Sequence, residues 1–147
     1  VSHLRAPMDP QGLMHALQVR TEQFRHEGAT TLEVVNEVPR LQLDAEREAQ
    51  VFHIVQEALT NVARHARASD VQIGLHQAGG ALQISVRDNG VGYPDDALRR
   101  EGSMGLIGMR ERAALLGGHA ELSNPPGGGA LLRVQLPLAP EDKENRA

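Results

Sequence analysis

Two neighbouring segments of alternating apolar and polar residues constrain the fold of this chain more than any other feature. VQIGLHQ spans residues 71–77 and ALQISVRD spans residues 81–88. A period of two is typical of a β-strand that buries one face, because successive side chains point to opposite sides of a sheet. Only residues 78–80 separate the two segments, so we predict a hairpin with antiparallel pairing. The sheet should therefore have one buried face and one face largely in contact with water.

Three amphipathic helices and three further strands are predicted around this hairpin. In the longest helix, Val51, Val55, Ala58 and Val62 form one apolar stripe, and Asp44 is placed to cap its start. We predict an α+β fold, namely a two-layer sandwich in which about three helices cover one face of a mostly antiparallel mixed sheet. The predicted helices span residues 11–27, residues 45–66 and the stretch from Gly105 to the Gly117–Gly118 pair, and the further strands span residues 30–35, 119–123 and 130–136.

Length and composition limit the possible functions. The chain has 147 residues, a net charge of −4, no cysteine, two phenylalanines, one tyrosine and no tryptophan. The negative charge and the scarcity of aromatic residues argue against nucleic-acid binding, and the lack of cysteine excludes disulfides, thiolate metal sites and cysteine nucleophiles. No apolar stretch approaches the length of about 18 residues that spans a membrane.

The sequence begins without methionine, which indicates a fragment of a longer protein. Residues 1–10 contain two prolines and are predicted to be a linker. Residues 11–138 are predicted to form one domain, and the charged residues 139–147 a disordered tail.

The sharpest candidate for chemistry is HIVQEALTNVARHAR, residues 53–67, on the longest predicted helix. Glu57 and Asn61 are four residues apart and share a face. At about 100° per residue Arg64 stays within about 20° of Glu57, whereas His65 falls nearer the apolar stripe. An acid, an amide oxygen and a guanidinium in one row suit a magnesium-phosphate site, because magnesium prefers hard oxygen ligands and arginine binds phosphate. The alternative is a solvated helix face that carries a Glu–Arg pair.

A second candidate is DNGVGY, residues 88–93, directly after a predicted strand. A carboxylate only accepts hydrogen bonds, so Asp88 would receive the exocyclic amine of adenine and reject the carbonyl of guanine. Gly90 and Gly92 would let a ring lie against bare backbone. The alternative is a plain Asx turn.

A third candidate is the glycine-rich start of the last predicted helix, GSMGLIGMRERAALLGG, residues 102–118. Free backbone N–H groups at a helix start bind phosphate without a basic side chain. The alternative is a flexible loop followed by a capped helix. The later NPPGGG stretch, residues 124–129, is interpreted as a tight turn without chemistry.

In this order and spacing, the three motifs resemble the ATP-binding domain of sensor histidine kinases. The wider superfamily includes DNA gyrase, the mismatch-repair ATPases and the heat-shock chaperone ATPases. The stretches QEALTNVARHA, DNGVG, GLIGMRERAALLGG and LRAPMDPQGLMHALQ are similar to the nitrate/nitrite-sensor subgroup, and the resemblance covers residues 4–138. Residues 1–10 would then link the domain to a dimerisation and phosphoacceptor domain.

The resemblance implies a role for each matching residue. Asn61 would bind Mg²⁺ and Glu57 would organise the metal or its water, while Arg64 and His65 would lie near the phosphates of ATP. Glu57, Asn61 and Arg64 would form the catalytic group. Asp88 would read adenine above the turn of Gly90 and Gly92. The residues expected to hold the phosphates, beside a short lid at residues 94–101, are Gly102, Ser103, Gly105 and Leu106.

Two departures from the family pattern matter. The last strand usually opens with Gly-Thr, whose hydroxyl supports the adenine-reading aspartate, whereas this chain has Gly129 and Ala130. The loss of one hydrogen bond is expected to cost roughly 0.5–1.5 kcal/mol of nucleotide affinity. None of the seven histidines has the acidic His-Asp context of the family's phosphoacceptor.

We therefore expect the catalytic domain of a cytoplasmic two-component sensor histidine kinase that binds Mg-ATP and donates the γ-phosphate to a histidine on a separate domain. The expected partners are that dimerisation domain and a response regulator, with a homodimeric parent, possible anchoring of the parent in the inner membrane, and a monomeric fragment. The alternatives are an ATPase or protein-serine kinase of the same superfamily, in which Glu57 would act as general base, or a degenerate domain that only binds partners.

Overall fold

The computed structural model describes residues 12–28, 30–38, 43–93 and 104–138. The predicted linker (1–10), lid (94–101) and tail (139–147) lie outside these ranges. The elements in chain order are helix α1 (Leu13–Glu27), strand β1 (Thr31–Asn36), helix α2 (Ala45–Asn61), the π-helical turn η2 (Val62–Ala66), strands β2 (Asp70–Ala78) and β3 (Ala81–Asp88), helix α4 (Met104–Leu115), and strands β4 (His119–Ser123) and β5 (Ala130–Pro137).

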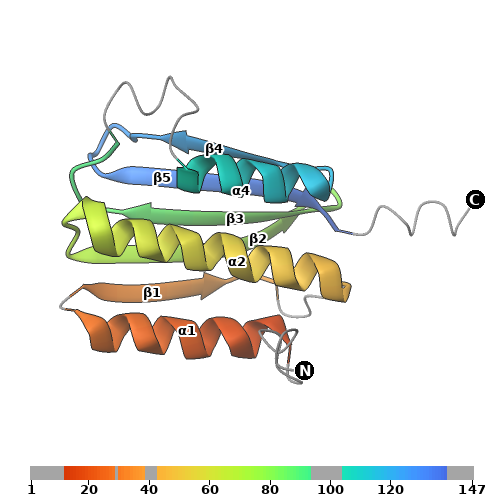
Figure 1. Ribbon diagram of the computed structural model, residues 1–147, viewed down its shortest axis with the longest axis horizontal. Helices are drawn as coiled ribbons and strands as arrows, with labels where there is room; N and C mark the ends of the chain where they lie inside the picture. Colours follow the sequence, from red (N-terminus) through yellow and green to blue (C-terminus); the bar gives the residue numbers. More distant parts are fainter. Residues whose placement is uncertain (1–11, 29, 39–42, 94–103, 139–147) are drawn as a thin grey trace, which may run out of the picture.

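The five strands form one mixed sheet in the order β1-β2-β3-β5-β4 (Figure 1). The predicted hairpin of β2 and β3 is formed, with Ala78 opposite Ala81 at its turn. Strand β1 is parallel to β2, and the other three neighbouring pairs are antiparallel. The parallel pair arises because α2 lies between β1 and β2 in the chain and returns the second strand to the same direction. The predicted mostly antiparallel mixed sheet is confirmed.

One face of this sheet is buried, as its alternation predicts. In β3, Leu82, Ile84 and Val86 are buried, while the residues between them are half-buried or exposed. The register aligns buried residues into rows across the strands, such as Leu75–Ile84–Val134. The helices follow the sheet in the order α1, α2, α4 (Figure 1), and their buried side chains join those of the strands in one core. Among the described residues, no helix has both the length and the apolar character needed to cross a bilayer.

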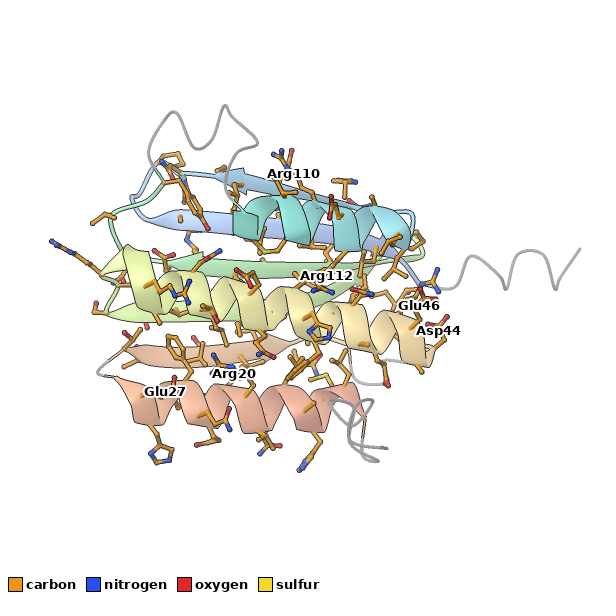
Figure 2. All side chains as sticks on the ribbon, in the orientation of Figure 1. Arg20, Glu27, Asp44, Glu46, Arg110 and Arg112 are labelled. Carbon is orange, nitrogen blue, oxygen red and sulfur yellow. The ribbon has the colours of Figure 1, made fainter. Side chains whose placement is uncertain are left out.

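Helix α2 lies between α1 and α4 (Figure 1). Hydrogen bonds to β5 and to α4 hold it in place. Its start is capped by Asp44, as predicted, because the carboxylate accepts a hydrogen bond of 2.8 Å from Arg47 N. The buried Arg47 side chain also donates to Pro137 O at 3.1 Å, which ties the helix start to the end of β5. On the side of α4, Arg112 Nη1 donates to Gln50 Oε1 at 3.1 Å (Figure 2).

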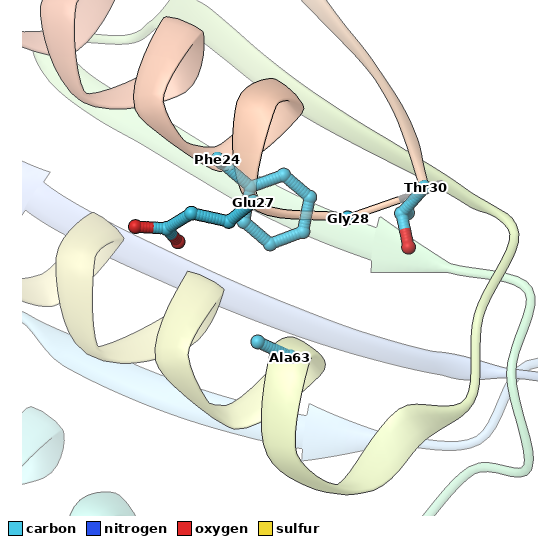
Figure 3. Close-up of a pocket in the computed structure, with 5 residues that line it drawn as sticks. All are labelled: Phe24, Glu27, Gly28, Thr30 and Ala63. Carbon is cyan, nitrogen blue, oxygen red and sulfur yellow. The ribbon is translucent and has the colours of Figure 1, made fainter.

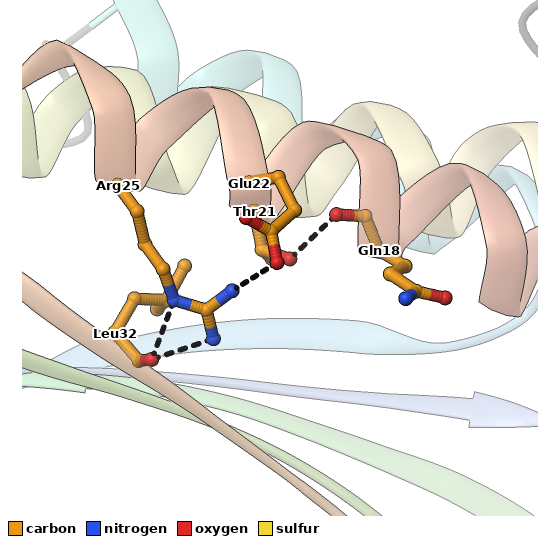
Figure 4. Close-up of polar contacts among 5 residues, drawn as sticks. All are labelled: Gln18, Thr21, Glu22, Arg25 and Leu32. Atoms are coloured by element: carbon orange, nitrogen blue, oxygen red, sulfur yellow. Dashed lines mark hydrogen bonds and ion pairs between the residues drawn. The ribbon is translucent and has the colours of Figure 1, made fainter.

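The packing of α1 against the sheet includes one arginine that bonds to backbone. Arg25 donates to Leu32 O through Nε at 3.1 Å and Nη2 at 2.8 Å, and its Nη1 pairs with Glu22 at 3.0 Å (Figure 4). The Leu32 carbonyl belongs to β1, the outer strand of the sheet. Arg25 therefore fastens α1 to that edge.

The end of α2 differs from the prediction. A single α-helix was expected over residues 45–66, whereas the α-helix ends at Asn61 and the chain continues as a π-helical turn from Val62 to Ala66. A π turn closes its hydrogen bonds over five residues instead of four, so it advances by a smaller angle per residue. The rotation of about 100° per residue, from which Arg64 was predicted to align with Glu57, therefore holds only as far as Asn61.

The stop of α4 at Gly117–Gly118 is confirmed and has a specific geometry. Gly117 has φ +81°, and its N–H donates to Ala114 O at 3.0 Å, while Gly118 N donates to Ala113 O at 2.8 Å. These two bonds form a Schellman motif, in which a left-handed glycine ends the helix. Gly118 also lies against β5, because a Cβ at this position would be 2.0 Å from Gln135 O.

The Gly118→Ala substitution should therefore destabilise the domain by about 2 kcal/mol or more, because the new methyl group collides with backbone that cannot rotate away. Gly108→Ala is a matched control within α4, since nothing lies within 4 Å of a Cβ there. Replacement of this helical glycine should stabilise the domain by about 0.5–1 kcal/mol. Urea unfolding of both variants measures the two effects, and equal stabilities would contradict the packing described here.

Candidate functional site

The ends of three elements lie at the same end of the molecule. The colours of Figure 1 place the end of α2 with η2, the end of β3 and the start of α4 on one side of the ribbon. Glu57 and Asn61 are near the end of α2, Arg64 is in η2, and Asp88 is the last residue of β3. The structure therefore brings the three predicted motifs to one end of the sheet.

Asp88 is a buried acid at the edge of the hydrophobic core. Its exposed fraction is 6 %, and it continues the inward row of Ile84 and Val86 on β3, so its side chain lies on the helix-covered face. Its Oδ1 accepts a hydrogen bond of 2.8 Å from Gly90 N, which is the Asx turn of the alternative interpretation. A plain surface turn would not bury the carboxylate, because removal of a charge from water is costly without polar partners.

The start of β5 and the glycine before it lie directly beside Asp88. Ala130 is its register partner and is itself buried. An alanine offers no side-chain hydrogen bond, so the departure noted in the sequence lies directly beside the predicted adenine-reading residue. Gly129, with φ +81°, passes beneath the strand end so closely that a Cβ would be 1.9 Å from Asp88 O.

Asn89, within the DNGVGY motif, has a structural role that the motif alone does not reveal. Its Oδ1 accepts hydrogen bonds of 3.0 Å from both Ser69 N and Asp70 N, and its Nδ2 donates to Ser69 Oγ at 3.0 Å. These bonds fasten the end of β3 to the start of β2. Because successive strand residues point to opposite sides, an asparagine directly after an inward Asp88 was placed to point outward, and this parity was the signal available in the sequence.

The Gly92–Tyr93 turn packs against the connection between β4 and β5. Gly92 has φ +82°, and a Cβ there would be 2.9 Å from Gly129 O and 3.1 Å from Asn124 Oδ1. Asn124 accepts a hydrogen bond from Tyr93 N at 2.9 Å and donates one to Tyr93 O at 2.7 Å. Gly92 is thus required by the close approach of protein backbone, which is a reason independent of any ligand.

The side chains of the α2 candidates make no polar contacts within the described ranges. Glu57 and Asn61 are half-buried and Arg64 is exposed, and none of the hydrogen bonds or ion pairs found among described residues involves their side chains. The Glu–Arg pair of the alternative interpretation is therefore not formed.

The glycine-rich candidate is described only in part. Helix α4 begins at Met104, so Gly105 and Leu106 lie in its first turn, whose backbone N–H groups have no partner within the helix. Gly102 and Ser103 lie outside the described residues, and the same holds for the side chains of His65 and Leu106.

A separate small pocket of about 120 Å³ lies between the end of α1 and η2 (Figure 3). Its walls contain none of the predicted site residues. The lining residues are Phe24, Glu27, Gly28, Thr30 and Ala63.

Comparison with known proteins identifies the family. Residues 46–140 match the family described as "Histidine kinase-, DNA gyrase B-, and HSP90-like ATPase", and this range contains all three motifs. The chain belongs to this family. This match confirms both the family resemblance and the fold that were predicted from the sequence.

Relatives of this chain include bacterial sensor proteins. The chain is 35 % identical over 142 residues to the sensor histidine kinase LiaS of Bacillus subtilis, covering 96 % of this chain and 39 % of LiaS. It is 33 % identical over 133 residues to the nitrate/nitrite sensor protein NarQ of Escherichia coli, covering 90 % of this chain and 23 % of NarQ. The chain therefore spans well under half the length of either relative.

Solved structures agree with this assignment. The blue-light activated histidine kinase EL346 of Erythrobacter litoralis superposes with a TM-score of 0.76 at 26 % identity, over 89 % of this chain and 43 % of that chain. The ATP-binding domain of PrrB from Mycobacterium tuberculosis superposes with a TM-score of 0.65 at 26 % identity, over 82 % of this chain and 93 % of PrrB.

Tyr93, the single tyrosine of this chain, lies close to the candidate site. Burial, and secondarily the negative charge of Asp88, raise the pKa of Tyr93 from 10.0 to about 12. The folded protein thus holds the neutral phenol more strongly than the unfolded chain does. The resulting stabilisation is complete below pH 10 and is lost as the pH rises through about 12.

Asp88→Asn should lower the pKa of Tyr93 only in part, because it removes the smaller cause and leaves the burial. Ultraviolet absorbance of the phenolate measures this pKa at a single residue. An ordinary pKa of 10.0 in the folded wild-type protein would contradict the burial of Tyr93 described here.

Proposed function

We propose that this chain is the catalytic, ATP-binding domain of a two-component sensor histidine kinase, which binds Mg-ATP and presents the γ-phosphate to a histidine on a separate dimerisation domain. The observation that carries this proposal is the buried Asp88 carboxylate on the helix-covered face, at the end of the sheet that also holds Glu57 and Asn61. The family match and the kinase relatives support it.

Asp88 selects the base in this proposal. A carboxylate offers only acceptors, so it pairs with the exocyclic amine of adenine and repels a carbonyl at the same position. The Gly90 N–H group orients the carboxylate through the 2.8 Å hydrogen bond. The lack of a side chain at Gly90 would leave backbone accessible beside the base, and Gly92 would keep this turn packed against Gly129.

The phosphates would lie between α4 and the end of α2. Unpaired N–H groups in the first turn of α4, at Gly105 and Leu106, attract anions together with the helix dipole. Gly102 and Ser103, which directly precede this turn in the sequence, are proposed from the family resemblance to contribute to phosphate binding. Arg64 and His65, on η2, would neutralise phosphate charge from the opposite side.

The oxygen atoms of Asn61 and Glu57 suit Mg²⁺, with Asn61 as direct ligand and Glu57 acting through water. No group of three or more histidine, aspartate or glutamate side chains capable of holding a metal exists among the described residues. In this proposal Mg²⁺ would be held by one or two protein oxygens together with the phosphates of the substrate, as is usual for this ion. When bound, Mg²⁺ supplies charge neutralisation of the phosphates.

The phosphoacceptor lies elsewhere in this proposal, because none of the seven histidines has an acidic His-Asp context. In this proposal the domain is a monomeric, cytoplasmic unit that acts on the dimerisation domain of a homodimeric parent. The phosphoryl group would then pass from that domain to a response regulator. Catalysis consists of positioning and charge neutralisation.

Isothermal titration with ATP and magnesium tests the proposal directly. Wild-type protein should bind ATP, and Asp88→Asn should weaken binding about 10- to 100-fold, because a hydrogen bond to a charged group contributes about 1.5–3 kcal/mol. Asp70→Asn is the matched control, since it makes the same change at the exposed start of β2 and should leave affinity unaltered. Absence of binding at millimolar ATP would disprove the proposal.

The superfamily ATPases supply the competing function, and Glu57 discriminates between the two. Its half-buried carboxylate has no hydrogen-bond partner among the described residues, and in an ATPase it would take the proton of the attacking water. As a kinase domain, the wild-type chain should release little inorganic phosphate from ATP, and Glu57→Ala should change that release little. Rapid hydrolysis that Glu57→Ala abolishes would favour an ATPase.

A further inference from the structure

Asn124 joins two segments that are far apart in the sequence. It follows β4 directly, and its carboxamide bonds both polar groups of the Tyr93 backbone, accepting from N at 2.9 Å and donating to O at 2.7 Å. A neighbouring β-strand would make the same two-point contact. The side chain of Asn124 thus makes a strand-like contact with Tyr93, five residues after the end of β3.

The surrounding contacts leave this turn little freedom. The Cα of Gly92 lies so close to the β4–β5 connection that a Cβ would be 2.9 Å from Gly129 O. Gly129 in turn packs beneath the backbone of Asp88. Within the described part of the chain, Asn124 is the hydrogen-bond partner of residues 91–93. Removal of its carboxamide therefore releases the turn while the glycine packing remains.

We propose that Asn124 is a positioning residue of the nucleotide site, which fixes the Gly92–Tyr93 turn relative to the Asp88 carboxylate. This inference rests on the function proposed above. Asn124 bonds to the backbone of Tyr93, whereas the Asp88 side chain accepts its hydrogen bond from Gly90 N. Asn124 therefore acts on the site through the turn and not through the Asp88 side chain. A binding site whose parts are held rigidly in advance loses less conformational entropy when the ligand binds.

The chain offers a site-specific probe of this clamp. It contains one tyrosine, so protein labelled with ¹⁵N-tyrosine gives a single backbone amide signal. This signal comes from the Tyr93 N–H group, which donates a hydrogen bond to Asn124. Hydrogen exchange at this signal reports the clamp without nucleotide, and calorimetric titration with Mg-ATP reports its effect on binding.

Three variants isolate the contribution. Asn124→Ala removes both hydrogen bonds, whereas Asn124→Asp keeps an acceptor for Tyr93 N and loses the donor to Tyr93 O. Asn36→Ala is the matched control, because Asn36 Oδ1 accepts a comparable 2.8 Å bond from Val38 N. Asn36 pairs with Leu75, so it lies far along β2 from Val71, the partner of Asp88.

In Asn124→Ala we expect exchange of the Tyr93 amide to accelerate about tenfold or more, and the Kd for ATP to rise about three- to tenfold. Asn124→Asp should retain part of the amide protection. Asn36→Ala should change both quantities less than about twofold, although it removes one hydrogen bond as well.

The outcomes separate this inference from the proposed function. Wild-type ATP affinity in a folded Asn124→Ala variant overturns the positioning role, whether or not the Tyr93 amide exchanges faster. If Asn124→Ala does not fold, unaltered ATP affinity in Asn124→Asp overturns it equally. Failure of the wild-type protein to bind ATP contradicts the proposed function itself, whereas accelerated exchange in Asn124→Ala would still demonstrate the clamp.

Discussion

The position of one carboxylate on the buried face of the sheet organises this end of the molecule. Leu82, Ile84 and Val86 point towards the helices, and Asp88 takes the next inward position at the end of β3. A shift of the register by one residue would turn Asp88 to the wet face together with all its apolar neighbours. The hydrophobic core of the sheet therefore fixes the direction of the acid, and the burial of the acid is inseparable from the stability of the fold.

Side chains from two other segments hold the turn that follows Asp88. Asn89 bonds to Ser69 and Asp70 at the start of β2, and Asn124 bonds to Tyr93 from the β4–β5 connection. One asparagine thus anchors the turn to the start of β2, and the other anchors it to the β4–β5 connection. Such support from rigid elements is what a binding site built on a loop requires.

Patterns that depend on neighbours in the sequence predicted most of the fold. Alternation predicted β2 and β3, the Asp44 cap predicted the start of α2, and the Gly117–Gly118 pair predicted the end of α4. Each of these features follows from local geometry, so the sequence alone was sufficient.

Features that depend on distant backbone were not predicted. The π turn after Asn61 was missed because its apolar pattern over a few residues is compatible with an α-helix. The bonds of Asn124 to Tyr93 join residues 31 positions apart, and the NPPGGG stretch gave no sign of them. Gly92 was predicted to lie at a ligand site, which stays a prediction, and the close approach of Gly129 gives a second reason for glycine that the sequence did not reveal.

The register gives a physical meaning to Ala130, where the family usually has a threonine. Ala130 lies opposite Asp88 and contributes no hydroxyl group, so β5 supplies no side-chain hydrogen bond to the acid. The orientation of Asp88 then depends on the Gly90 N–H group, and hence on the conformation of the turn that contains it. In a relative with the hydroxyl, the strand and the turn would share this task. In this chain the turn orients the Asp88 carboxylate through the Gly90 N–H group. The side chains that hold this turn, Asn89 and Asn124, therefore have a larger effect on the orientation of the acid than they would have beside a threonine.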